Sequence, residues 1–289
     1  MTNLRTILRA APFATIAAGV IGLNSPVYAE QILVAPTISH GITLDGDTAD
    51  WDGIAGITVP LSGNGGVDSV ELKAVVHGDM IYVLAVWEDS SEDILHKPYK
   101  WDDASQSYKK TKQMEDRLAI SLRMSGDFSA NKTDGSVFEA DVWHWKASRS
   151  NPAGVAHDKM WKVSAKPFKK AKEHKTPDGK TVYVARLSDA GDRLYKPLKY
   201  DAKQDDVMPR YEVKKNPQGS IADVQAKGVW RDGHWYLELA RKLDTGHADD
   251  AVISAAGNIE IAVAAFDHVD GKNHSVSETL VLKTVGPAS

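Results

Sequence analysis

The segment 141–152 carries the densest set of chemically capable side chains in the sequence, reading Asp-Val-Trp-His-Trp-Lys-Ala-Ser-Arg-Ser-Asn-Pro. On a β-strand, His144 and Lys146 would point to one side and Trp143 and Trp145 to the other. A face with histidine and lysine can meet the carboxylates of a ligand, and a face with two tryptophans can wall an apolar pocket. The same pattern also fits a core strand whose histidine is hydrogen-bonded.

Four aspartates, Asp45, Asp47, Asp50 and Asp52, could offer oxygens to calcium. Their spacing departs from an EF-hand loop, because the glycine is misplaced and no glutamate stands at the twelfth position. Turn chemistry explains them better: the Asp-Gly pair makes a bend, and Trp51 packs onto the sheet.

No nucleophile or phosphate-binding motif stands out in the sequence. A Gly-x-Ser-x-Gly elbow, a His-Glu-x-x-His helix and a phosphate loop are all missing. Asp-Asp pairs at 102–103, 205–206 and 249–250 have turn-like surroundings, where solvated acids are the default. We therefore predict that this chain alone carries no enzyme active site.

The N-terminus predicts export. Arg5 and Arg9 precede an apolar stretch at 10–23, and small residues end at Ala29, where a signal peptidase would cleave. The apolar stretch has about 14 residues, fewer than the roughly 18–20 that span a bilayer. We expect a signal peptide at 1–29 and a periplasmic mature protein, since no later segment is long and apolar enough to span a membrane.

Cleavage would leave 260 residues and remove two arginines but no acids, so the formal net charge falls from −4 to −6. This mild acidity argues against a nucleic-acid partner. The chain has no cysteine. It therefore has no disulfide, and no metal or haem can be held by a thiolate.

Short strands separated by turn signals must position these residues. Segments 70–76 and 80–87 read as a hairpin around a turn at 77–79. Further strands are expected at 117–123, 141–146, 233–240, 259–266 and 277–283. Because no long helical period appears, we predict an all-β fold, an antiparallel β-sandwich with long loops and a few short helices.

A lysine-rich stretch interrupts this pattern. Residues 159–180 contain eight lysines together with Pro167 and Pro177, which predicts a loop-like excursion. A solvated insertion explains it better than a docking patch. We therefore expect a single domain over 30–289 with a lysine-rich insertion around 159–220.

Short sequence blocks spread over nearly the whole mature chain carry a family resemblance. They are Leu44-Asp-Gly-Asp47 with Trp51, Ala85-Val-Trp-Glu-Asp89, Glu115-Asp-Arg-Leu-Ala-Ile120, 141–152, Asp223-Val224 with Trp230, Gly233-His-Trp235, Leu239-Ala-Arg-Lys-Leu243 with Thr245-Gly246, and Ala264-Ala-Phe-Asp267 with His274-Ser-Val-Ser277. Their order resembles the haem-binding family typified by the γ subunit of ethylbenzene dehydrogenase. Its relatives serve dimethyl sulfide dehydrogenase, chlorate reductase and selenate reductase. The front half alone also resembles family 9 carbohydrate-binding modules.

The resemblance implies a β-sandwich that holds one haem b between loops at one end. Without a cysteine, the haem would be non-covalent. The protein would pass single electrons between the iron–sulfur relay of a molybdenum oxidoreductase and a soluble cytochrome, while substrate chemistry sits on another chain. The alternative is a carbohydrate-binding module without haem.

The resemblance also implies axial ligands. In the γ subunits these are a methionine and a lysine, and His274 stands in the place of the lysine. Neutral imidazole has a lone pair available near neutral pH, so the exchange suits haem. A solvent-exposed loop histidine is the alternative, and Lys272 is the reserve if the loop has shifted.

The second ligand is less defined, because 131–138, where the family methionine sits, contains no methionine here. His96, on a loop after a long strand, is the favoured replacement, followed by Met124 and then His144. On this hypothesis His274 and His96 bind the iron, and Trp143, Trp145 and Lys146 contact the cofactor.

Overall fold

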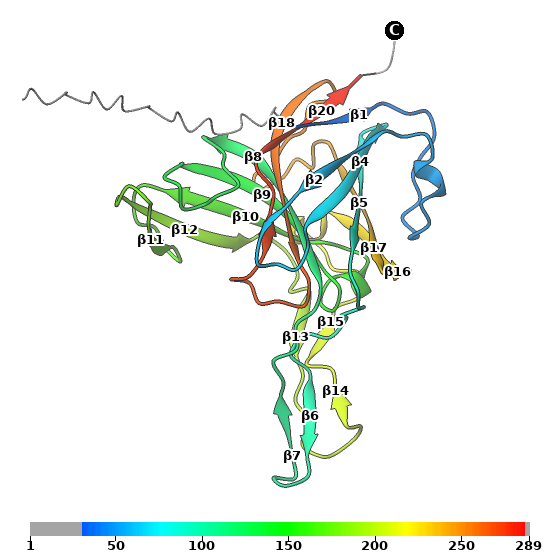
Figure 1. The fold of residues 1–289 in the computed structure, drawn as a ribbon, viewed down its shortest axis with the longest axis vertical. Coiled ribbons are helices and arrows are strands. Elements are labelled where there is room, and N and C mark those ends of the chain that lie inside the picture. The colour runs from blue at the N-terminus through cyan, green and yellow to red at the C-terminus, as the bar shows by residue number, and fades with distance from the viewer. Residues whose placement is uncertain (1–30, 287–289) are drawn as a thin grey trace, which may run out of the picture.

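The computed structural model describes residues 31–286, and these form two mainly antiparallel β-sheets packed face to face (Figure 1). The predicted all-β sandwich is therefore confirmed. The helical content consists of three short 3-10 helices, Ala49–Trp51, Asn151–Ala153 and Ser220–Ala222. None of the helices in the described part of the chain is long and apolar enough to cross a membrane. The expected signal peptide lies outside the described residues.

The larger sheet has ten strands, with the path order β1-β20-β18-β8-β9-β10-β12-β11, and β19 and β3 attached beside β18. Only β1 and β20 pair in parallel; the other pairs are antiparallel. The strands are β1 (Ile32–Pro36), β3 (Ser62–Gly63), β8 (Arg117–Gly126), β9 (Phe138–Lys146), β10 (His157–Ser164), β11 (Lys172–Lys175), β12 (Thr181–Ser188), β18 (Gly257–Phe266), β19 (Ser275–Val276) and β20 (Leu280–Val285).

The smaller sheet has the order β16-β17-β5-β4-β2. Its strands are β2 (Gly56–Pro60), β4 (Ser69–His77), β5 (Met80–Glu88), β16 (Gln225–Arg231) and β17 (His234–Lys242). The predicted hairpin forms β4 and β5, and Gly78 makes its tight turn with a φ of 60°. Residues alternate between core and surface along these strands, so one face of each sheet builds the main hydrophobic core.

A narrow arm projects from one end of the sandwich (Figure 1). It contains a three-stranded sheet, β14-β6-β7, and a two-stranded sheet of β13 and β15 lies at its base. These strands are β6 (Tyr99–Asp102), β7 (Ser107–Lys110), β13 (Tyr195–Pro197), β14 (Val207–Met208) and β15 (Tyr211–Val213).

The loop-like excursion expected over 159–180 is wrong in its secondary structure. Most of β10 and all of β11 lie within it, joined by a loop, and with β12 they extend the larger sheet as a wing at the left of Figure 1. Lys159 is buried, whereas the lysines of β11 are exposed. The lysines suggested a loop, but strands at the edge of a sheet can also carry solvated lysines.

The aspartates of 45–52 take part in turn contacts, as expected. Asp45 Oδ1 accepts a hydrogen bond from the Asp47 backbone amide at 2.8 Å. Trp51 is fully buried, and its Nε1 donates to Glu238 Oε1 at 2.9 Å. The segment therefore anchors a loop to β17.

Candidate functional site

Strand β9 separates its side chains into two different environments. Trp143 and Trp145 face the smaller sheet and are buried in the main core. The Trp145 ring lies 6.0 Å from Trp87 and 4.9 Å from Trp235, measured between centroids. The expectation that the two tryptophans wall a ligand pocket is therefore corrected: the partner sheet fills their side of the strand, and they are core residues.

His144 and Lys146 emerge on the opposite, outer face of the larger sheet, and each is only 2% exposed. Strand register places Lys146 beside Arg117 of β8 and His144 beside His157 of β10. Polar side chains from neighbouring strands thus meet on one surface. We call this set the basic face: Arg117, His144, Lys146, His157, Lys159 and Arg186.

A chain of nitrogen atoms runs across the basic face. Lys146 Nζ lies 2.7 Å from His157 Nδ1, and Lys159 Nζ lies 2.9 Å from His157 Nε2. Both lysines are less than 8% exposed. Within residues 31–286, no carboxylate forms an ion pair with Arg117, Lys146, Lys159 or Arg186. The face therefore gathers positive charge without matching negative charge.

Burial and mutual repulsion shift these bases toward their neutral forms. Burial, followed by the charge of Arg186, lowers the pKa of Lys159 to about 7. Burial, followed by the charge of Lys159, lowers the pKa of Lys146 well below its usual value. Burial also lowers the pKa of His157 strongly. Such a cluster is costly unless an anion compensates it, which marks it as a candidate anion site.

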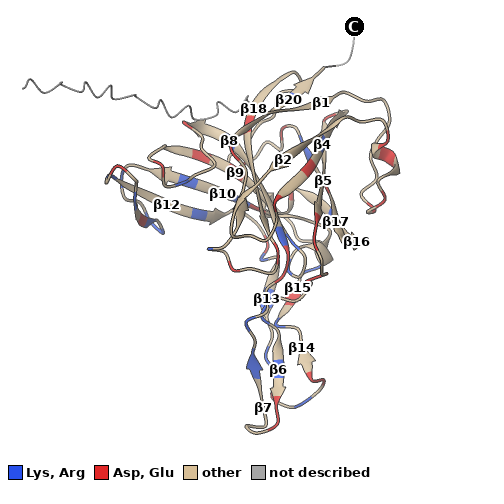
Figure 2. Cartoon of the chain, in the orientation of Figure 1, with Lys and Arg blue, Asp and Glu red and all other residues tan. Residues whose placement is uncertain are grey.

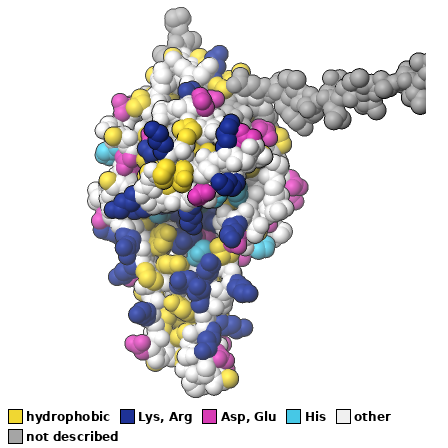
Figure 3. Space-filling model, turned by 90° about the vertical axis from the view of Figure 1, so that its left-hand side faces the viewer, with side chains coloured by type: hydrophobic (Ala, Val, Ile, Leu, Met, Phe, Trp, Pro, Cys, Tyr) yellow, Lys and Arg dark blue, Asp and Glu magenta, His cyan; other side chains and the backbone are white. Residues whose placement is uncertain are grey.

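A surface cleft opens beside this cluster. It has a volume of about 440 Å³ and is lined by His157, Ser188, Asp189, Tyr195 and Tyr211, among others. Figure 3 shows this side of the molecule, with Lys and Arg side chains gathered from the wing down to the arm. Figure 2 shows basic positions on β10, β12 and the arm strands. An anionic ligand can therefore approach the basic face from solvent.

His274 lies beside the same face, on the loop between β18 and β19. Its ring centroid is 5.4 Å from that of Phe266. The Phe266 centroid in turn lies 5.9 Å from that of His144. The Arg117 guanidinium sits 4.1 Å from the Phe266 centroid. The structure thus brings His274 and His144 into one neighbourhood, with Phe266 between them.

One nitrogen of each of these two histidines has no hydrogen-bond partner. His274 Nδ1 and His144 Nε2 are buried and have no hydrogen-bond partner. Burial, followed by the charge of Lys132, lowers the pKa of His274. Burial, followed by the charge of Lys146, lowers the pKa of His144 well below its usual value. Both imidazoles therefore favour the neutral form near pH 7. Arg186 Nη1, which can only donate, lies 3.5 Å from His144 Nδ1, so the lone pair of His144 faces Arg186.

The family model described as ethylbenzene dehydrogenase matches residues 48–277. The chain belongs to the ethylbenzene dehydrogenase family. None of the curated proteins matches it.

Among solved structures, the chain is similar to a family 9 carbohydrate-binding module from Caldicellulosiruptor kristjanssonii in complex with cellotriose. The TM-score is 0.40 and the identity 9%, covering 90% of this chain and 96% of the module. For the glucose complex of such a module from the same organism, the TM-score is 0.40 and the identity 10%, covering 90% and 98%.

His96 has a different environment in this member of the ethylbenzene dehydrogenase family. Its Nδ1 lies 3.1 Å from Glu115 Oε1, and its ring packs against Tyr211. Glu115 also accepts backbone hydrogen bonds from Ser148 and Arg149. Burial alone would raise the Glu115 pKa, but the His96 hydrogen bond and the Arg149 charge lower it to about 2. His96 Nδ1 thus faces the Glu115 carboxylate, and burial lowers the pKa of His96.

Met124 occupies the opposite end of β8 from Arg117. It packs against the main core and borders a separate cleft with Arg123, Ile253 and Thr284. Seven residues of strand, roughly 23 Å, separate it from Arg117. Met124 therefore lies at the edge of the core.

Sequence reasoning missed Lys132, which lies in the very stretch that lacks the family methionine. Its Nζ lies 5.0 Å from the centre of the Trp161 ring. Burial, followed by the charge of Arg186, lowers its pKa to about 8, and its charge in turn acts on His274. The signal was present in the sequence, because a lysine amine can replace a thioether as a ligand at the same position.

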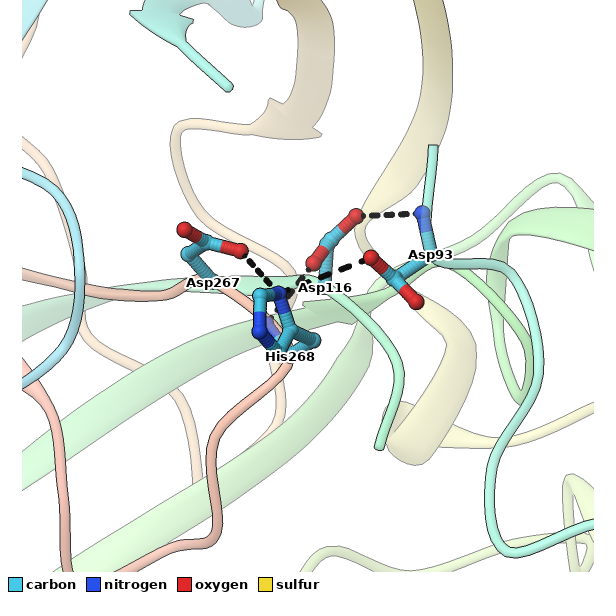
Figure 4. Close-up of side chains that lie close together, drawn as sticks. All are labelled: Asp93, Asp116, Asp267 and His268. Carbon is cyan, nitrogen blue, oxygen red and sulfur yellow. Dashed lines mark hydrogen bonds and ion pairs between the residues drawn. The ribbon is translucent and has the colours of Figure 1, made fainter. Parts of the chain in front are cut away.

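A group of acids fixes the loop that carries His274 (Figure 4). Asp116 accepts hydrogen bonds from the backbone amides of Asp93 at 2.8 Å and His268 at 2.9 Å. His268 Nδ1 lies 2.5 Å from Asp267 Oδ1 and 3.5 Å from Asp93 Oδ2. Asp116 is buried and also accepts a hydrogen bond from Trp235 Nε1. It therefore holds the start of the loop against the core.

Proposed function

We propose that the protein is a periplasmic electron-transfer protein that binds one haem b non-covalently. The observation that carries the proposal is a buried basic face, without carboxylate partners, adjoining a neutral histidine whose Nδ1 has no partner. Haem b presents what this surface lacks: two propionate anions and an iron that accepts nitrogen ligands. Membership of the ethylbenzene dehydrogenase family supports the same cofactor.

The donor set fits haem. His274 would supply one axial nitrogen, and Lys132 the other. A lysine with a pKa of about 8 has an appreciable neutral fraction near neutrality, so its amine can bind iron. The propionates would be held by Lys146, Lys159 and Arg186, since a cation that is buried without a partner gains most from an anion. His144 would then contact the cofactor without ligating it.

When bound, the haem would cycle between its ferric and ferrous forms and carry one electron. The chain's own residues would hold the iron through nitrogen, neutralise the propionates and keep water from the buried side of the site. Export through the predicted signal peptide and a molybdenum oxidoreductase or soluble cytochrome as partner belong to the proposal. No catalytic residue is assigned, because substrate chemistry would sit on the partner.

The deciding experiment is an absorption spectrum of the purified protein, as isolated and after haem reconstitution. A Soret band with sharp α and β bands on reduction would support the proposal. The pigment should leave the polypeptide in acidified organic solvent, because the sequence offers no cysteine for attachment. A protein that stays colourless after reconstitution and binds oligosaccharides would instead favour the carbohydrate-binding alternative.

We expect His274→Ala to weaken haem binding by roughly tenfold or more, or to convert a low-spin spectrum to high-spin. Lys132→Ala should do the same if it supplies the second nitrogen. His40→Ala is the matched control, because His40 is exposed on the loop after β1. Titration with haem, followed at the Soret band, measures the change.

Two outcomes would redirect the assignment. If His274→Ala retains full haem and an unchanged spectrum whereas Lys272→Ala does not, the ligand is the lysine two residues earlier. If both Lys132→Ala and His274→Ala leave the spectrum unchanged, the axial ligands are not on these two loops. His96 and His144 would then be the remaining histidine candidates.

A further inference from the structure

A cluster of buried carboxylates lies on the inner side of β9 and β10, opposite the basic face. Asp141 on β9, Asp158 on β10 and Asp250 on the loop after β17 each place an oxygen within 4.8 Å of the other two. Asp141 and Asp158 are fully buried, and Asp250 is 6% exposed. Three carboxylates from distant parts of the sequence therefore converge on one point in the interior.

Several oxygens of this cluster have no partner. Asp141 Oδ1, Asp158 Oδ2 and Asp250 Oδ1 are buried without a hydrogen bond. Both carboxylate oxygens of Asp189, which is 7% exposed, are in the same condition. Asp189 directly follows Ser188, which pairs with Lys159 in the register of β10 and β12, so it lies at the end of β12 next to Asp158 of β10. Buried carboxylate oxygens that lack both protons and partners are strongly unfavourable.

The nearby cations do not balance these acids. Arg241 pairs with Asp141 Oδ2 and donates to the Ala251 carbonyl, so its charge offsets one carboxylate. Lys159 is close to Asp189, but its Nζ binds His157 and Ser188 on the other face. Three carboxylates thus share one close cation, Arg241, with His247 Nδ1 further away at 3.9 Å from Asp250 Oδ2, and burial, followed by the charge of Asp141, raises the pKa of Asp158.

The remaining contacts hold the carboxylates in place without supplying charge. Thr245 Oγ1 donates to Asp250 Oδ2 at 2.6 Å, and the Ala251 backbone amide donates to Asp141 Oδ2 at 3.0 Å. His247, which is more exposed, pairs with Asp223: its Nδ1 lies 2.6 Å from Asp223 Oδ2. The Lys159 backbone amide donates to Asp158 Oδ1, so Asp141, Asp158 and Asp250 each have one oxygen engaged by the protein and one without a partner.

We propose that Asp141, Asp158 and Asp250 form a binding site for one divalent cation of the calcium class, with Asp189 as an additional oxygen ligand. The donors are all carboxylate oxygens, which hard cations prefer, and the set contains no sulfur or free imidazole to favour zinc or copper. The five unpartnered oxygens approach the six to eight that Ca²⁺ takes, and water can complete the shell.

The site would join four segments: β9, β10, the loop after β12 and the loop after β17. Because β17 belongs to the smaller sheet, a bound cation would tie the wing of the larger sheet to its partner. The same strands present the basic face on their other side. Cation binding would therefore stabilise the strands that carry that face, whether or not the protein binds haem.

The test is thermal unfolding of the full-length, haem-free protein after chelator treatment, titrated with CaCl₂. We expect the Tm to rise by roughly 5–10 °C at a hundredfold excess over Kd, with one Ca²⁺ bound per chain by calorimetry. MgCl₂ should give a smaller rise, since Mg²⁺ keeps its water shell more tightly. Absence of both a Tm rise and bound calcium would overturn the proposal.

Asp158→Asn provides the decisive variant. It removes one of the repelling charges, so the metal-free variant should fold with a Tm equal to or above that of the wild type, yet lose the calcium-dependent rise. Asp93→Asn, in the acid group of Figure 4, is the matched control and should keep the rise. If Asp93→Asn abolishes the rise and Asp158→Asn retains it, calcium binds at the other group and the assignment is wrong.

Discussion

Replacing Lys159 with methionine is expected to stabilise the ligand-free protein by roughly 1–4 kcal/mol at pH 7 and to weaken haem binding. Lys159 is 7% exposed, and its Nζ hydrogen-bonds His157 and Ser188. A buried cation that is replaced by an apolar side chain of similar volume removes a desolvation penalty. Opposite changes in stability and binding are typical of a residue retained for function.

The pKa of Lys159 also predicts how this difference in stability changes with pH. Burial lowers the folded-state pKa of Lys159 to about 7, below the unfolded value of 10.5. Between these values the unfolded chain binds more protons, so the free energy of unfolding rises with pH. The cost of burying the charged Lys159 amine is fully present below about pH 7 and has disappeared near pH 10.5. Urea unfolding of wild type and Lys159→Met over this range should show a difference that shrinks as pH rises.

Lys169→Met is the control for the loss of one positive charge. Lys169 is exposed on the loop between β10 and β11, so its removal should leave both the stability and its pH dependence within about 0.5 kcal/mol of wild type. A Lys159→Met variant that is less stable than wild type at pH 7 would show that the lysine is a structural contact rather than an uncompensated charge.

Trp145→Ala is expected to lower the free energy of unfolding by about 3–5 kcal/mol. The indole is fully buried against Trp87 and Trp235, and its Nε1 donates to Asn151 Oδ1 at 3.0 Å. The same Asn151 oxygen accepts from the Gly228 amide, so the cavity would also loosen β16. Urea unfolding followed by circular dichroism measures the loss.

Trp101→Ala distinguishes a core tryptophan from one on the arm. Trp101 lies on β6, is partly exposed, and hydrogen-bonds Asp103 in the same turn. We expect its removal to cost less than about 1.5 kcal/mol. If Trp145→Ala instead remained as stable as wild type and lost only ligand binding, the residue would be part of a pocket and not of the core.

The two predictions concern opposite sides of adjacent strands. Trp145 packs between the sheets, whereas Lys159 lies on the outer face with His144 and His157. The inner side supplies stability through apolar burial, and the outer side concentrates charge that lowers it. A strand that is buried on both faces but polar on one is typical of a binding surface built on a core element.

The sequence by itself determined the strands and the faces of several of them. The hairpin of β4 and β5 follows from alternation around a tight turn, and the assignment of Trp143 and Trp145 to the side opposite His144 and Lys146 follows from the two-residue period of a strand. These features are local, because backbone geometry and side-chain spacing set them without reference to the rest of the chain.

Only the tertiary structure decided which residues meet across strands. The sequence did not reveal whether the tryptophan side would face a pocket or a second sheet. Strand register places His157 beside His144, and the loop after β18 returns His274 to Phe266. The convergence of Asp141, Asp158 and Asp250 likewise depends on packing between β9, β10 and the loop after β17. Such contacts join residues up to about a hundred positions apart, and pairing register and loop paths, rather than local propensity, determine them.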